Sequence, residues 1–129
     1  MKLKAVSSKW LVFAGAFIIG AFTYWTIPYE DLVLLGFIFT LRWAIYSAII
    51  SLIVHLRAKI LSGMLAFWIA SGFVSAVLIR IIYESLGNAI AHNLWPLELI
   101  LIFGITFIPA FLVGLLSKSI GRIIRKEKE

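Results

Sequence analysis

The chain has 129 residues, of which 63% are hydrophobic and only 14% are charged. Soluble domains average about 25% charged residues, so the composition argues against an ordinary water-soluble domain and indicates a membrane protein. We attribute the net charge of +6 to membrane topology rather than to nucleic-acid binding, and the lack of cysteine excludes disulfides, thiolate metal sites and a cysteine nucleophile.

The first expected helix covers residues 10–27. Basic residues precede it and an apolar run follows, as in a signal peptide. The run ends in Tyr24 and Trp25 instead of a small-residue cleavage site, so we expect an uncleaved helix whose aromatic residues lie at the membrane interface. Pro28 ends the helix, because proline has no N–H to donate and restricts the residue before it.

The second expected helix covers residues 32–54. At ~1.5 Å per residue, an apolar run of this length crosses a hydrocarbon core of ~30 Å. Arg42 is its single charged residue and lies near its middle. A guanidinium at that depth costs on the order of 2.5–3.5 kcal/mol, so it needs a partner, water or a function. Tyr46 lies on the same face, one turn further along.

Two more apolar runs predict helices at residues 61–82 and 94–116, separated by a loop at residues 84–93. Pro109 falls inside the fourth helix, and we expect it to kink that helix. Residues 117–129 form a basic amphipathic tail whose isoleucines can face the acyl boundary. The basic residues expected to contact lipid headgroups are Arg122, Arg125, Lys126 and Lys128.

Small side chains recur every four residues on the expected helices, and such rows let helix backbones approach closely. The third helix is the richest in them, so we expect it to be the most buried in protein. Its rows are Ser62, Ala66 and Ala70, and Gly72 with Ala76. Rows on the other helices are Ala16 with Gly20, then Gly36, Thr40, Ala44 and Ala48, and finally Ala110 with Gly114.

Orientation follows from the basic residues. All Lys and Arg residues except Arg42 and Arg80 fall on one side of a four-helix topology. The positive-inside rule therefore places both termini in the cytoplasm. We expect a single all-α domain over residues 1–129, a polytopic membrane protein built as a bundle of four transmembrane helices in the cell membrane.

A weak internal repeat relates the starts of the second and fourth helices. The pattern P-x-E-x5-G-x2-F begins at Pro28 and again at Pro96. Both copies run from outside to inside, so a duplication would be parallel. Two simpler explanations remain open. One is chance similarity between apolar helices, and the other is the favourable placement of a carboxylate in a helix's first turn.

Charged and hydroxyl-bearing side chains gather toward the outer half of the expected bundle. Intramembrane charges usually pair or line a wet cavity, so one interpretation is a polar pocket, open to the outside, that binds an anion or a lipid headgroup. The alternative is structural, with Arg42 capped by carbonyls or a hydroxyl or placed at a subunit contact. The candidate pocket comprises Arg42, Tyr46, Arg80, Glu84 and Glu98.

No arrangement typical of an enzyme is found among the motifs of the sequence. His55 and His92 fall on opposite sides of the expected bilayer and cannot share an ion. We predict no catalytic residue, metal ligand or cofactor.

Two function classes remain. The first is a non-catalytic subunit or oligomeric scaffold of a membrane complex, and the second is a small transporter or channel component with its site around Arg42. The expected partners are the lipid bilayer, anionic headgroups at its cytoplasmic face, and copies of this chain or other membrane subunits, but not nucleic acid.

Overall fold

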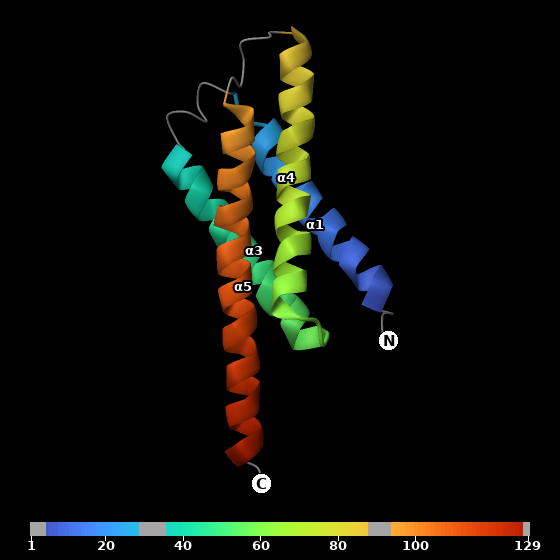
Figure 1. Ribbon diagram of the computed structural model, residues 1–129, viewed down its shortest axis with the longest axis vertical. Coiled ribbons are helices and arrows are strands. Elements are labelled where there is room, and N and C mark those ends of the chain that lie inside the picture. The colour runs from blue at the N-terminus through green and yellow to red at the C-terminus, as the bar shows by residue number, and fades with distance from the viewer. Residues whose placement is uncertain (1–4, 29–35, 88–93, 128–129) are drawn as a thin grey trace.

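The computed structural model describes residues 5–28, 36–87 and 94–127. Over these ranges the chain forms helices joined by short connections and contains no strand (Figure 1). The predicted all-α class is therefore confirmed. The four helices are α1 (Ala5–Trp25), α3 (Gly36–Arg57), α4 (Ser62–Gly87) and α5 (Trp95–Glu127).

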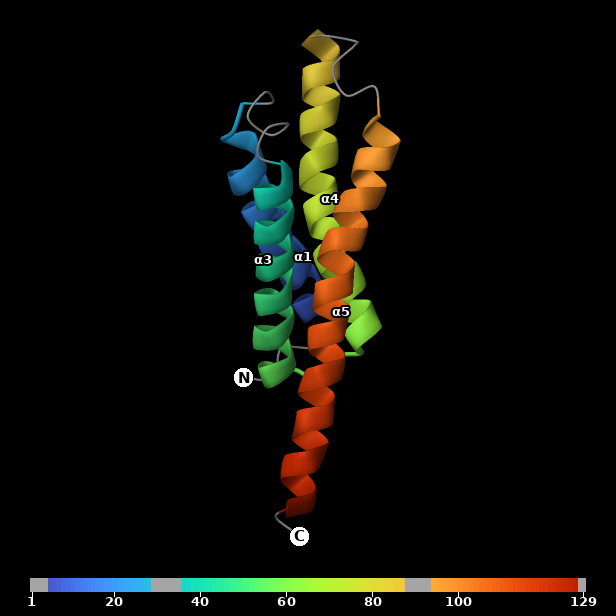
Figure 2. The same ribbon diagram turned by 90° about the vertical axis from the view of Figure 1, so that its left-hand side faces the viewer.

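The helices form a bundle with α4 and α5 side by side in its middle. Helix α1 packs across α4, and α3 packs across α5, whereas α3 touches α1 and α4 only lightly. Successive helices run in opposite directions, so α1 begins and α5 ends toward the same end of the bundle (Figures 1 and 2). We call that end, where α3 ends and α4 begins, the inner end. The outer end is where α1 and α4 end and α5 begins.

Two helices are long and apolar enough to cross a membrane by length and composition. They are α4 and the Trp95–Ile123 part of α5. Over their described residues, α1 and α3 do not meet the same criterion. The helical class is thus established, and two candidate spans are identified within it.

Helix α4 supplies most of the buried core, as predicted. Ten of its 26 residues are buried. Its large buried side chains recur every four residues and form one continuous ridge, and neighbouring helices pack onto ridges of this kind. The ridge consists of Leu65, Ile69, Phe73, Val77 and Ile81.

The predicted small residues are the points of closest helix approach. A Cβ added to Gly72 of α4 would lie 2.7 Å from the Ala16 Cβ and 2.7 Å from the Phe13 carbonyl oxygen of α1. A Cβ added to Gly114 of α5 would lie 2.8 Å from the Cβ of Ser62 on α4. Real side-chain atoms do not approach so closely, so only glycine fits at either crossing.

The predicted loop at residues 84–93 is wrong in its first part, because α4 continues to Gly87. Glu84 therefore lies on the helix, four residues after Arg80, and the two side chains form an ion pair across one turn. Pairs at this spacing stabilise a helix, which accounts for the additional turn beyond residue 82. Residues 88–93 lie outside the described ranges.

Helix α5 does not end at residue 116, where a separate tail was predicted. It continues as one helix through Pro109 and on to Glu127. Its 33 residues correspond to about 50 Å, so it exceeds a ~30 Å hydrocarbon core by about 20 Å. In Figure 1 its last turns extend beyond the other helices at the inner end. Basic residues near a helix C-terminus are favoured by the helix dipole, which helps the continuation.

Candidate functional site

The outer end of the bundle contains a polar cluster centred on Tyr24 of α1. The Tyr24 hydroxyl donates a 2.6 Å hydrogen bond to Oε1 of Glu98 on α5. The guanidinium of Arg80 on α4 lies over the Tyr24 ring, with Cζ 4.7 Å from the ring centroid. Arg80 also donates to the main-chain carbonyl of Tyr24. One buried side chain thus joins three helices.

The ion pair of the cluster is short and partly desolvated. The Arg80 Nε donates to Glu84 Oε1 at 2.6 Å, and the two side chains are 10% and 24% exposed. An arginine in this position interacts with a carboxylate, a ring face and a carbonyl at once. Its charge is therefore compensated within the protein, as burial of a charge requires.

Two indole N–H groups extend the cluster toward the core. The Trp43 Nε1 donates to Oγ1 of Thr23 at 3.0 Å, which ties α3 to α1. The Trp25 Nε1 donates to the carbonyl of Ala76 at 2.9 Å, which ties α1 to α4. The Tyr24 and Trp43 rings are 5.5 Å apart. These bonds fix the outer ends of the helices relative to one another.

Tyr24, expected among the aromatic residues at the membrane interface, is buried within the protein, since only 4% of its surface is exposed. Its position could have been inferred from spacing. Val12, Ala16, Gly20 and Tyr24 follow one another at four-residue intervals, and all four are buried in the structure. The small residues recognised as a packing row therefore pointed to Tyr24 as its next member.

The structure brings together three of the five residues predicted for the polar pocket. Arg80, Glu84 and Glu98 converge around Tyr24. Arg42 is exposed on α3. Tyr46 is half-buried and packs against the apolar core.

A second polar cluster lies at the inner end and is centred on His55 of α3. The His55 Nδ1 lies 2.8 Å from the carbonyl of Ser51, so Nδ1 carries the proton and donates. The Nε2 of a neutral ring is then an acceptor, and the Ser62 hydroxyl of α4 lies 3.3 Å from it. The Ser51 hydroxyl donates to the Ala110 carbonyl of α5 at 2.6 Å. This cluster holds α3, α4 and α5 together.

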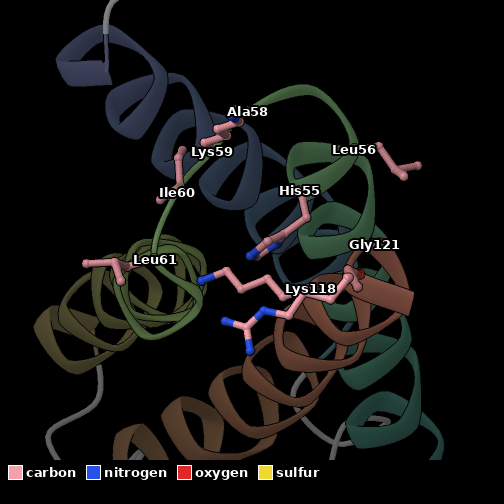
Figure 3. Close-up of a pocket in the computed structure, with 10 residues that line it drawn as sticks. His55, Leu56, Ala58, Lys59, Ile60, Leu61, Lys118 and Gly121 are labelled. Carbon is pink, nitrogen blue, oxygen red and sulfur yellow. The ribbon is translucent and has the colours of Figure 1, made fainter. Parts of the chain in front are cut away.

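Beside His55 is a cavity of about 420 Å³, shown in Figure 3. Its walls come from the end of α3, the connection at residues 58–61 and the α5 segment from Ser117 to Arg122. The side chains of His55 and Lys118 point into it. Lys59 and Arg122 also line it, so the cavity is basic.

The predicted headgroup contacts fall on or beyond this part of α5. Arg122 is exposed and lines the cavity. Arg125 and Lys126 lie on the last turns of α5, and Lys128 lies outside the described residues. Most of the first copy of the predicted repeat, including Glu30, and the second histidine, His92, also lie outside them.

Comparison with family models, with curated proteins and with solved structures gave no match. The function is therefore argued from the two clusters, the cavity and the surface of the bundle.

Proposed function

We propose that the chain is a multi-pass protein of the cell membrane that spans the bilayer four times and acts as a non-catalytic subunit or oligomeric scaffold of a membrane complex. The observation that carries this proposal is the contrast between a closed interior and an apolar exterior. A scaffold needs surfaces for lipid and partner helices, whereas a transporter needs a polar route through its interior.

The interior between the two polar clusters is filled with apolar and small side chains. Leu65, Ile69, Phe73 and Val77 expose 1% of their surface or less. Among the described residues, every buried side-chain nitrogen or oxygen has a hydrogen-bond partner. Such an interior leaves no unsatisfied polar group to attract water or a solute.

All four helices expose large apolar side chains, including the two that fall below the span criterion. Phe22 on α1 is 74% exposed, and Leu56 on α3 is 76% exposed. Soluble monomers rarely expose large contiguous apolar patches, so these faces suit contact with lipid or with another membrane helix. With 21 and 22 residues, α1 and α3 would each cover about 30 Å, which matches the hydrocarbon core.

The charges of the described residues agree with the proposed orientation. Lys9, Arg57, Lys59, Lys118 and Arg122 lie toward the inner end. Glu84 and Glu98 lie toward the outer end, together with Arg80. The positive-inside rule supports a cytoplasmic location for the inner end, with both termini on that side.

The alternative, a transporter or channel component with its site around Arg42, has less support. Arg80 and Glu98 are already engaged with Tyr24 and with the ends of three helices. Arg42 is exposed on the surface of α3, where it is suited to contact a partner subunit, since intramembrane charges usually pair or face a polar environment.

Purification in a mild detergent tests the proposed function. We expect native mass spectrometry to find the chain in a defined homo-oligomer or with a stoichiometric membrane partner. If Arg42 lies at the contact between subunits, the Arg42→Ala variant should weaken that assembly. The matched control is Arg57→Ala, which removes an exposed arginine at the inner end. A chain that remains monomeric in membranes and transports a solute would overturn the proposal.

A further inference from the structure

We propose that the basic cavity at the inner end is a binding site for a phosphate group. Its volume of about 420 Å³ falls within the range of ~300–1,000 Å³ that is usual for small-ligand sites. The cavity lies between segments that are far apart in the sequence, the 58–61 connection and the last third of α5 (Figure 3). It therefore exists only in the folded chain.

The charges around the cavity are all of one sign. Lys118 and Arg122 are four residues apart on α5 and so lie on one face of it, and Lys59 comes from the connection opposite. None of the described residues that line the cavity is acidic. Three cations with no carboxylate between them suit a phosphate, which accepts charge-assisted hydrogen bonds from ammonium and guanidinium groups.

The start of α4 adds to the positive potential. Residues 58–61 lead directly into Ser62, the first residue of α4. The first N–H groups of a helix have no partner within it, and the helix dipole places partial positive charge there. Anions are commonly found at such positions. The first turn of α4 follows directly on the cavity wall at Leu61, so its partial positive charge lies near the three basic side chains.

Apolar side chains border the same cavity. Leu56 and Leu61 line it and are 76% and 67% exposed. A basic pocket between transmembrane helices on the cytoplasmic side is a recognised arrangement for lipid headgroups, with the acyl chains against the apolar border. The lipid source of the phosphate rests on the proposed membrane topology. Binding of the phosphate group itself does not depend on it.

The test uses the full chain in detergent micelles with phosphatidylglycerol and phosphatidylcholine in equal amounts. Native mass spectrometry measures which lipid remains bound, with and without millimolar inorganic phosphate, and calorimetry measures binding of inorganic phosphate alone. The charge variant is Lys118→Gln with Arg122→Gln. Its matched control is Lys9→Gln with Arg57→Gln, which removes two charges at the inner end but outside the cavity.

A second pair of variants tests the cavity without changing charge. A Cβ added to Gly121 meets no atom within 4 Å, so Gly121→Leu places a bulky side chain at the cavity wall without a clash at its Cβ. Gly104→Leu, also on α5 and also without a neighbour within 4 Å, is the control. We expect both cavity variants to weaken binding by ~10-fold or more and both controls by no more than ~3-fold.

A lipid headgroup is supported as the ligand if the protein retains phosphatidylglycerol in preference to phosphatidylcholine. This preference must be lost in the cavity variants and must persist when inorganic phosphate is added. Cavity-dependent binding of inorganic phosphate supports a free phosphate as the ligand, and it does so even if the proposed membrane role fails. The proposal is overturned if the cavity variants bind phosphatidylglycerol and inorganic phosphate as their controls do.

Discussion

The hydroxyl of Tyr24 donates a 2.6 Å hydrogen bond to the carboxylate of Glu98, across 74 positions of sequence. The bond joins α1 to α5, two helices whose described backbones do not pack against each other. The helix between them, α4, contributes Arg80 to the same cluster. The outer end of the bundle is thus held by polar contacts around a single buried tyrosine.

Tyr24→Phe should lower the free energy of unfolding by ~1–3 kcal/mol, because it removes a hydrogen-bond donor from a partly buried carboxylate. Unfolding by SDS in mixed micelles measures the change. The control is Tyr83→Phe, since Tyr83 on α4 is 77% exposed, and its effect should stay within about 0.5 kcal/mol. Equal effects of the two variants would show that the bond to Glu98 contributes no stability.

Gly72→Ala should destabilise the bundle by ~1–3 kcal/mol, because the added methyl group would lie 2.7 Å from both Ala16 Cβ and the Phe13 carbonyl oxygen. Gly15→Ala on α1 is the matched control, since no atom lies within 4 Å of its added Cβ. Alanine is a better helix former than glycine, so this control should gain up to ~1 kcal/mol. The same unfolding titration should therefore give changes of opposite sign, and a stabilised Gly72→Ala would contradict the close crossing of α1 and α4.

Ser51→Ala should lower the free energy of unfolding by about 0.6–1.7 kcal/mol, from the average to the largest value measured for side-chain hydrogen bonds between the helices of a membrane protein. The variant removes the 2.6 Å bond from Ser51 to the Ala110 carbonyl, which joins α3 to α5. Ser117→Ala is the control, because the Ser117 hydroxyl donates to the Val113 carbonyl of its own helix. A Ser51→Ala variant as stable as this control would show that the bond between helices adds nothing.

The proposed topology predicts opposite labelling of the two ends of the bundle. Because the chain contains no cysteine, single cysteines can be introduced directly. Ser85→Cys, exposed at the outer end of α4, should react with a membrane-impermeant maleimide added to intact cells. Ser119→Cys, exposed at the inner end of α5, should react only after permeabilisation. The reverse pattern would invert the orientation, and labelling of both from outside would exclude it.

Much of the packing could be predicted from the sequence because it depends on local spacing. Ala16, Gly20, Gly72 and Gly114 were recognisable as small residues in rows, and all four are buried at helix contacts. The end of α4 was misplaced because Glu84 was taken for a loop residue. The ion pair with Arg80 that extends the helix depends on side-chain geometry, which composition does not reveal.

The polar sites were less predictable, because they depend on which side chains the fold brings together. Arg80, Glu84 and Glu98 were named together from the sequence and lie together in the structure, but the sequence did not connect them with Tyr24. At the inner end, no sequence pattern connects Lys59 with Lys118.

The sequence by itself determined the helical class, because long apolar runs with small residues at four-residue intervals are typical of closely packed helices. It also determined the distribution of charge between the two ends. Only the tertiary structure decided that Arg42 is exposed while Arg80 is enclosed, since this depends on how α1, α3 and α4 cross. It also decided that the Ser117–Arg122 segment of α5 and the connection before α4 line one basic cavity.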